Sequence, residues 1–328
     1  MAKFGILGAG TWGVALANML VSMNHIVTCW GYKKEEVYSL NKTHKHPQLA
    51  CPISPVIYFT NDLKEAIIEQ EYVIFAVPSN AFRTIAEQAK EYINKDQIFI
   101  SVSKGIEEKS LLTMSEILQD VLGKDIKVIA LSGPTHAEEV AIGLPTLIVA
   151  ASENIKVAEQ VQNEISNSVL RVYVNRDIKG VEIAGAIKNV FALAAGMSDG
   201  MGFGDNAKAA IITRGLTELS RLATKMNCTP ETFFGLTGIG DIVVTATSKF
   251  SRNHNAGVLL AKGYSLEETN KQIGMVIEGV NALKAAKELA EKYQVEMPIV
   301  YAVYDVVYGG VDPKIAVSQL FSRKIGHE

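Results

Sequence analysis

The chain has 328 residues, of which 48% are hydrophobic and 20% charged, so it is not a disordered, fibrous or collagen-like protein. Its length exceeds the ~100–200 residues of a typical single domain, which predicts two domains. Lysine and arginine total 32 against 35 acidic residues, and this balance offers no overall basic field for a nucleic acid. We expect neither a targeting leader nor a membrane-spanning apolar run, and therefore a cytoplasmic protein without integral membrane association.

The first half of the sequence alternates short apolar runs with helical patterns. Strands are predicted at residues 4–7, 26–30, 72–77, 98–102, 128–131 and 147–151, and helices at residues 12–23, 81–92 and 111–122. Such alternation is typical of βαβ units that build a mainly parallel sheet. The pattern therefore predicts an α/β domain with a doubly wound sheet, which we place at residues 1–177.

A glycine-rich motif, Gly8-Ala9-Gly10-Thr11-Trp12-Gly13, follows the first predicted strand and opens a helix. Gly8 would permit a tight turn, Gly10 would let a pyrophosphate approach the backbone, and Gly13 would let helix and strand pack closely. The N-terminus of the helix would supply N–H donors to the anion. This context predicts a Rossmann-type dinucleotide site rather than a simple glycine turn.

The end of the second strand bears on the choice of dinucleotide. An NAD-selective protein usually places Asp or Glu there, whereas this chain has Gly31-Tyr32-Lys33-Lys34. The two lysines could meet a 2′-phosphate, or they could be ordinary solvated side chains. Because Glu35 and Glu36 follow closely, the sequence predicts that NADP(H) is accepted but leaves its preference over NAD(H) open.

Two further predicted strands end in polar residues. Lys104 lies in Ser101-Val102-Ser103-Lys104-Gly105, and Gly133 and Thr135 lie in Ser132-Gly133-Pro134-Thr135. Ligands of open α/β sheets bind outside the carboxyl ends of the strands, so both segments are candidates for the site. Alternatively, Thr135 and Glu138 fit a capping box that only starts a helix.

The cysteines and the nearby histidines do not predict a metal site. Cys29, Cys51 and Cys228 are isolated and lack the paired spacing of a zinc site or a disulfide framework. His44 and His46 lie near Cys51, but no second ligand pair accompanies them. We therefore interpret this segment as a loop.

The second half is predicted to be helical. After one more strand at residues 171–174, alanine-rich helical patterns cover residues 180–197, 206–226, 265–273, 279–293 and 298–308. We therefore expect an all-helical domain at residues 178–328.

Two polar features interrupt this helical half. Lys188 lies in a strongly apolar helix with Ala184, Ala192 and Ala195 on its face, where it is either functional or a snorkelling lysine. Farther on, Gly238-Ile239-Gly240-Asp241 is followed by Ser251-Arg252-Asn253. Arg252 can bind phosphate through two parallel hydrogen bonds.

With these motifs together, the chain resembles bacterial NAD(P)-dependent sn-glycerol-3-phosphate dehydrogenases over essentially its whole length. The resemblance rests on residues 8–13, 102–105, 132–135, 186–190, 196–200, 204–210, 213–215, 238–241, 251–253 and 278–279. It implies reversible hydride transfer between NAD(P)H and C2 of dihydroxyacetone phosphate. The product would be sn-glycerol 3-phosphate for phospholipid synthesis, and the family expectation is a homodimer.

The resemblance also implies roles for individual residues. Lys188 would be the catalytic proton donor or acceptor. The substrate would be contacted by Lys104, Gly133, Thr135, Lys188, Asp241, Ser251, Arg252 and Asn253. Besides Gly8, Gly10 and Gly13, the residues facing the cofactor would be Thr11, Trp12, Tyr32, Lys33, Lys104, Ala137, Arg252, Val276 and Glu278.

The chain departs from the family pattern in a few places, and two other functions stay open. His136 replaces a usual aromatic residue, His254-Asn255 replaces a more basic pair, and residues 41–55 are atypical. The first alternative is another β-hydroxyacid-type dehydrogenase, acting on 6-phosphogluconate or a small 3-hydroxy acid. The second is a non-catalytic NADP-binding sensor, which would not need Lys188, Asp241 or Arg252.

Overall fold

The computed structural model describes residues 1–324, and its contacts divide the chain into two compact units. The first unit comprises residues 1–104 and 112–182, and the second comprises residues 105–111 and the chain from residue 183 onwards. Helix α7 (Ile178–Gly200) contributes to both units. The predicted domain boundary after residue 177 lies at the start of this helix, whereas the contacts divide the chain between Glu182 and Ile183.

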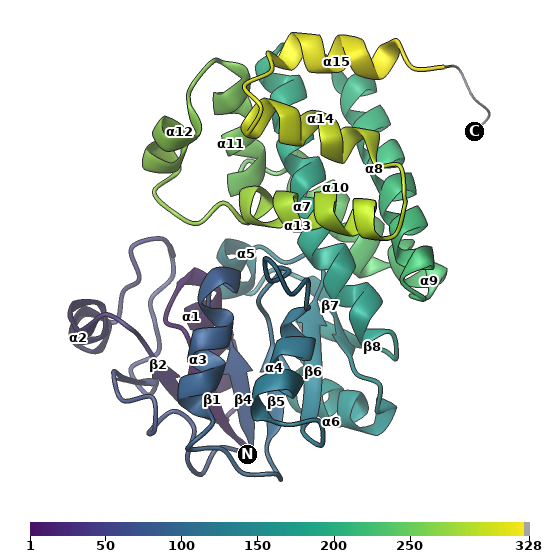
Figure 1. Cartoon of the computed structure of the whole chain (residues 1–328). Coiled ribbons are helices and arrows are strands. Elements are labelled where there is room, and N and C mark those ends of the chain that lie inside the picture. Colours follow the sequence, from purple (N-terminus) through teal and green to yellow (C-terminus); the bar gives the residue numbers. More distant parts are fainter. Residues whose placement is uncertain (325–328) are drawn as a thin grey trace. The chain divides into compact units, whose positions relative to one another are not determined.

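A twisted sheet forms the centre of the first unit (Figure 1). Its strands are β1 (Lys3–Leu7), β2 (Ile26–Trp30), β3 (Tyr58–Thr60), β4 (Tyr72–Phe75), β5 (Ile98–Ser101), β6 (Lys127–Ser132), β7 (Thr146–Ala151) and β8 (Leu170–Asn175). They lie in the order β3-β2-β1-β4-β5-β6-β7-β8, and the neighbours are parallel except for β6 and β7. Because the strand order reverses between β1 and β4, the sheet has the switch point of a doubly wound fold.

Helices flank this sheet, and their cover explains why its strands are uninterrupted apolar runs. They are α1 (Thr11–Ser22), α2 (Lys34–Thr43), α3 (Phe82–Ala89), α4 (Met114–Leu122), α5 (Ala137–Ala141) and α6 (Ile155–Ile165), with a 3₁₀ turn at Ser79–Ala81. Every residue of β4 and β5 is buried. Strands covered on both faces read as continuous apolar runs, which is why the sequence predicted them. The predicted Rossmann-type fold is confirmed.

Besides the short helix α5 and the 3₁₀ turn, three elements of the first unit are not among those predicted from the sequence. Helix α2 is mostly charged and buries only Val37 and Leu40, and β3 has three residues. Helix α6 does bury an apolar face at Val157, Ala158, Val161 and Ile165, and this spacing could have been recognised.

The second unit is helical, as predicted. Besides α7 it contains α8 (Asp205–Lys225), α9 (Pro230–Phe233), α10 (Asp241–Thr247), α11 (Arg252–Ala261), α12 (Leu266–Ile273), α13 (Glu278–Lys292), α14 (Pro298–Val307) and α15 (Pro313–Phe321), with a π-helical turn at Leu236–Gly240. Helices α9, α10, α11 and α15 are not among the predicted elements. Within the described residues, α7 is long and apolar enough to cross a membrane, so the expectation that no such run occurs is wrong. Its apolar window is entirely buried by the rest of the protein.

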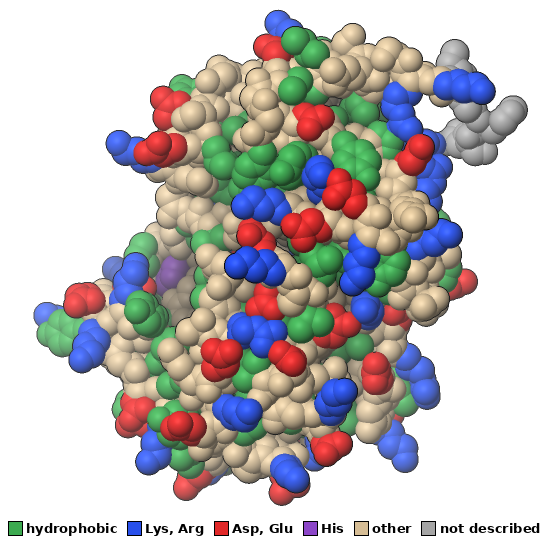
Figure 2. Space-filling model, viewed as in Figure 1, with side chains coloured by type: hydrophobic (Ala, Val, Ile, Leu, Met, Phe, Trp, Pro, Cys, Tyr) green, Lys and Arg blue, Asp and Glu red, His purple; other side chains and the backbone are tan. Residues whose placement is uncertain are grey.

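Surface charge follows the near balance of the composition. On the face shown in Figure 2, basic and acidic side chains are interspersed. This face therefore carries no extended field of one sign.

A buried carboxylate joins α8 to the start of α14. Glu218 accepts hydrogen bonds from the backbone N–H groups of Ile299 at 2.8 Å and Val300 at 3.4 Å. Helix N-termini leave such N–H groups without partners in the helix, and Pro298 at the first position supplies none. Burial raises the pKa of Glu218 to about 7, although the two backbone hydrogen bonds oppose the rise.

This raised pKa predicts a pH-dependent stability. The Glu218 carboxyl binds its proton more tightly in the folded protein than in the unfolded chain. The stability that this proton contributes is complete below the ordinary pKa of 4.5 and is lost as the pH rises through about 7. The loss is on the order of 3 kcal/mol. Glu218→Gln should therefore lose less stability than wild type between pH 5 and pH 8, measured by urea unfolding.

Burial also raises the pKa of Glu182 to about 7, so the Glu218→Gln variant should still lose some stability over this pH range. The effect of Glu218 is therefore the difference between the slopes of the variant and wild type. Glu288→Gln, an exposed change on α13, serves as the control and should keep the wild-type pH slope. Equal slopes for Glu218→Gln and wild type would show that Glu218 does not titrate in this range.

Candidate active site

The glycine-rich loop lies at the carboxyl end of β1 and opens α1. Gly8 has a positive φ of 126°, and a Cβ there would lie 2.4 Å from the carbonyl oxygen of Ala76. A Cβ on Gly13 would lie 2.0 Å from the oxygen of Gly8, so this helix turn also requires glycine. A Cβ on Gly10 would meet no protein atom within 4 Å. The backbone at Gly10, the N-cap of α1, therefore borders open space, and N–H groups of the first turn can donate hydrogen bonds to an anion there.

The end of β2 carries no carboxylate, as the sequence indicated. Tyr32 is exposed, and Lys33 precedes the first residue of α2. The Lys33 ammonium lies 2.8 Å from Glu36 Oε1, and both side chains are largely exposed. This hydrogen bond and the charge of Glu36 raise the pKa of Lys33. Any phosphate bound at Lys33 would have to compete with Glu36.

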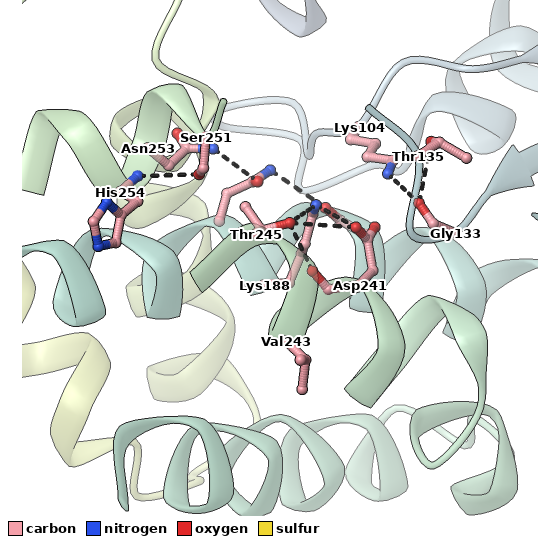
Figure 3. A network of polar contacts seen from close by, with 12 residues as sticks. Lys104, Gly133, Thr135, Lys188, Asp241, Val243, Thr245, Ser251, Asn253 and His254 are labelled. Atoms are coloured by element: carbon pink, nitrogen blue, oxygen red, sulfur yellow. Dashed lines mark hydrogen bonds and ion pairs between the residues drawn. The ribbon is translucent and has the colours of Figure 1, made fainter. Parts of the chain in front are cut away.

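The structure brings the ends of β5 and β6 together. Lys104 Nζ donates a hydrogen bond to the carbonyl oxygen of Gly133 at 2.9 Å, and Thr135 Oγ1 donates to the same oxygen at 3.2 Å (Figure 3). The alternative interpretation of Thr135 as the N-cap of a capping box is wrong, because His136 occupies the N-cap position of α5. One carbonyl group thus fixes a cationic and a hydroxyl side chain beside each other.

A buried ion pair is the main feature of the helical unit. Lys188 Nζ on α7 lies 2.6 Å from Asp241 Oδ1 on α10, and the two side chains are 7% and 1% exposed. Thr245 Oγ1 contacts the same ammonium and donates to the backbone oxygen of Asp241 at 2.6 Å (Figure 3). Lys188 therefore does not reach solvent as a snorkelling lysine would.

The polypeptide around this pair explains how it is held. Helix α7 is buried along its length here, and Ala184, Ala192 and Ala195 are fully buried beside the lysine. Asp241 begins α10 directly after the π-helical turn. In that turn a Cβ on Gly238 would lie 1.9 Å from the oxygen of Phe233, so the chain can approach itself only with glycine there.

The first turn of α11 lies near a second group of polar contacts. Ser251 caps the helix by accepting a hydrogen bond from the N–H of His254 at 3.2 Å. Asn253 donates to Asn189 Oδ1 at 2.9 Å and accepts from the N–H of Gly279 at 2.8 Å. Asn253 therefore links α7, α11 and α13 in addition to any ligand role.

The remaining predicted cofactor residues lie at the starts of helices or in loops. Arg252 is exposed and donates to the carbonyl oxygen of Val276 at 3.2 Å, which brings these two residues together. Ala137 and Glu278 are the first residues of α5 and α13. Thr11 donates to Gln48 Oε1 at 2.7 Å.

Thr245 and Asn189 are polar members of the site that the sequence analysis does not single out. Both are buried, and both contact residues that it does single out. Thr245 lies four residues after Asp241 on one helix face, and Asn189 follows Lys188 in an otherwise apolar helix. From these two positions in the sequence, Thr245 and Asn189 could have been recognised as site residues.

The comparisons with known proteins agree with the motifs. Sequence models of the N-terminus and the C-terminus of NAD-dependent glycerol-3-phosphate dehydrogenase match residues 3–158 and 177–318. The chain belongs to the NAD-dependent glycerol-3-phosphate dehydrogenase family. This confirms the resemblance and makes the chain an enzyme, in preference to a non-catalytic sensor or another type of dehydrogenase.

Similar glycerol-3-phosphate dehydrogenases span the whole chain. An NAD(P)+ enzyme of Lactobacillus delbrueckii subsp. bulgaricus is 50% identical over 99% of this chain and 98% of the relative. One from Bacillus subtilis is 47% identical over 100% of this chain and 96% of the relative. The crystal structure of the Coxiella burnetii glycerol-3-phosphate dehydrogenase superposes with a TM-score of 0.94 at 35% identity, covering 98% and 99% of the two chains.

The buried pair predicts unequal effects of single and double substitutions. Asp241→Asn should lower the free energy of unfolding by about 3–5 kcal/mol, because it leaves the Lys188 charge buried without its carboxylate. Adding Lys188→Met should recover at least half of this loss, since the unpaired charge is then removed. Urea unfolding of the two single variants and the double variant measures the coupling.

An exposed pair on α13 provides the control for this cycle. Lys287→Met and Glu291→Gln remove an ion pair whose side chains are 30% and 55% exposed. Their coupling should stay below about 1 kcal/mol. Additive losses at Lys188 and Asp241 would show that the two charges are stabilised independently.

Proposed function

We propose that the protein catalyses reversible hydride transfer between NAD(P)H and dihydroxyacetone phosphate, giving sn-glycerol 3-phosphate. The single observation that carries this proposal is a charged lysine held by a carboxylate and a hydroxyl in the buried part of the helical unit. Family membership, and the names of the relatives, supply the substrate.

Reduction of the ketone places a hydride on C2 and a proton on its oxygen. The nicotinamide of the bound cofactor supplies the hydride. We assign the proton to Lys188 Nζ, whose charge also polarises the carbonyl before transfer. Asp241 and Thr245 fix the direction of the ammonium group, so its N–H bonds need little reorganisation during the reaction.

The substrate phosphate is proposed to bind at the first turn of α11. A guanidinium has five N–H donors, and Arg252 directs one nitrogen to the oxygen of Val276, which leaves donors for phosphate oxygens. Ser251 and Asn253 would add neutral hydrogen bonds there. Lys104, Gly133 and Thr135 are also proposed as substrate contacts.

The cofactor is proposed to bind along the carboxyl edge of the sheet. The open space at Gly10 and the N-terminus of α1 fit a pyrophosphate. The glycines Gly8 and Gly13 shape this turn. The further proposed contacts are Thr11, Trp12, Tyr32, Lys33, Lys104, Ala137, Arg252, Val276 and Glu278.

The wider context of the reaction is also proposed. The product would supply glycerophospholipid synthesis in the cytoplasm. We expect a homodimer, the commonest symmetry among soluble oligomers. Sedimentation equilibrium of the purified chain tests the assembly state, and a monomer at micromolar concentration would contradict it.

The assignment of Lys188 predicts a large and selective loss of turnover. Wild-type protein should oxidise NADPH when dihydroxyacetone phosphate is added, followed by absorbance. Lys188→Ala should lower kcat by about 10²–10⁴, the usual contribution of a positioned acid–base group, while NADPH binding is kept.

Another lysine of the same helix provides the control. Lys179→Ala removes a partly exposed ammonium paired with Glu116, and its kcat should stay within a few-fold of wild type. If folded, NADPH-binding Lys188→Ala also turned over within a few-fold of wild type, the proton donor would be another residue, with Lys104 the next candidate.

The missing acid at the end of β2 predicts that NADPH is used at least as well as NADH. Replacing Lys33 and Lys34 by alanine should weaken NADPH binding by roughly tenfold or more, because charge-assisted hydrogen bonds to the 2′-phosphate are lost, and leave NADH binding nearly unchanged. Nucleotide titration followed by fluorescence measures both affinities. Lys42→Ala, in the last turn of α2, the helix that Lys33 and Lys34 begin, should change neither the NADPH nor the NADH affinity. Equal losses for the two nucleotides would refute a 2′-phosphate contact.

A further inference from the structure

The first turn of α11, where the substrate phosphate is proposed to bind, is called the phosphate turn here. A side chain outside the predicted site holds this turn against α7. His254 is the third residue of α11, directly after Ser251, Arg252 and Asn253. Its Nε2 lies 2.7 Å from Asp199 Oδ2, near the end of α7. Its Nδ1 is buried without a hydrogen-bond partner among the described residues, so the ring is fixed through Nε2.

The acceptor of this contact is itself held in place. Asp199 Oδ2 lies 2.8 Å from Lys208 Nζ of α8, and Lys208 also lies 3.9 Å from Asp205. Burial alone would raise the pKa of Asp199, but the hydrogen bonds from Lys208 and His254 outweigh it and hold the pKa below its ordinary value. Asp199 is therefore a charged, preoriented acceptor for the imidazole.

The backbones of α7 and α11 are packed too closely to slide. A Cβ on Gly196 would lie 1.9 Å from the carbonyl oxygen of His254, and a Cβ on Gly257 would lie 2.2 Å from the oxygen of Leu193. The Asn189 to Asn253 hydrogen bond ties the same two helices together. The start of α11 is thus joined to α7 by a backbone contact and two side-chain bonds.

Helix α7 also carries the proposed proton donor. Lys188 and Asp199 are eleven residues apart on it, which is about three turns and places them on one side of the helix. The lysine is held by Asp241 and Thr245 of α10, whereas the phosphate turn is held through Asp199. The two parts of the site therefore have separate supports on one rigid helix.

We propose that His254 is a positioning residue for the substrate phosphate, fixing the first turn of α11, and with it Arg252, to α7 through Asp199. This rests on the proposed function, because it takes that turn as the phosphate site. Removing the imidazole would leave the backbone contact at Gly196 and the Asn253 hydrogen bond as the remaining ties of this turn to α7, so Arg252 would be placed less firmly for phosphate. The Lys188 cluster would be unaffected, so affinity should fall while the chemical step is kept.

The test separates KM from kcat. His254→Ala should raise KM for dihydroxyacetone phosphate about 5–20-fold, the scale of one lost positioning hydrogen bond, with kcat within about threefold of wild type. His254→Gln keeps an N–H donor for Asp199 and should restore KM to within about threefold. The affinity for inorganic phosphate, measured by calorimetry, should follow the same order, and NADPH affinity should not change.

A second histidine offers a matched control. His25, in the first unit, accepts from the N–H of Ala2 at 3.1 Å and contacts the oxygen of Glu164 at 2.9 Å. His25→Ala should lower the melting temperature without changing KM. If His254→Ala behaved in the same way, its role would be structural and the proposal overturned.

The two proposals fail differently. No turnover of dihydroxyacetone phosphate by the wild-type protein would contradict the proposed function. In that case phosphate binding still decides about His254, because equal affinities of wild type and His254→Ala for inorganic phosphate would overturn the positioning role.

Discussion

A lysine ammonium and an aspartate carboxylate are buried 2.6 Å apart, and the helical unit is arranged to hold them. Removing two charges from water has a penalty of several kcal/mol for each, so such a pair contributes little net stability. It is tolerated because Thr245 supplies a further hydrogen bond and α7 provides a fully packed support. The pair makes sense as a site where a charged lysine is needed beside a substrate, which is how the proposed function uses it.

In the sheet unit, the glycine-rich loop after β1 depends on backbone geometry and not on paired charges. Gly8 and Gly13 are required because a Cβ would meet a carbonyl oxygen within 2.4 Å and 2.0 Å respectively. Gly10 has no such conflict, and its lack of a side chain keeps the start of α1 open. The same six-residue motif therefore forms a tight turn at Gly8 and Gly13 and leaves open space at Gly10. Both features follow from the positions of its glycines, so the motif alone predicts the site.

Features set by local sequence could be predicted, and features set by distant contacts could not. The buried strands and the glycine turn follow from apolar runs and from spacing within a few residues. Thr245 contacts Lys188, a residue 57 positions away, and the sequence shows locally only its spacing of four residues from Asp241. Helix α2 was missed because it buries little, and the capping box at Thr135 was wrong because the chain stays extended one residue longer, to His136.

Both proposed anion sites use the start of a helix, but they recognise different groups. With a net charge of −3 the chain has no general attraction for anions, so each site must supply its own donors. At α1 the cap residue is Gly10, and backbone N–H groups alone can serve a pyrophosphate of either dinucleotide. At α11 the cap residue Ser251 accepts a hydrogen bond from the backbone N–H of His254, and Arg252 adds a planar fork that can bind two oxygens of a phosphate ester. Substrate selectivity should therefore depend on how firmly that one turn is held, whereas pyrophosphate binding at α1 should not.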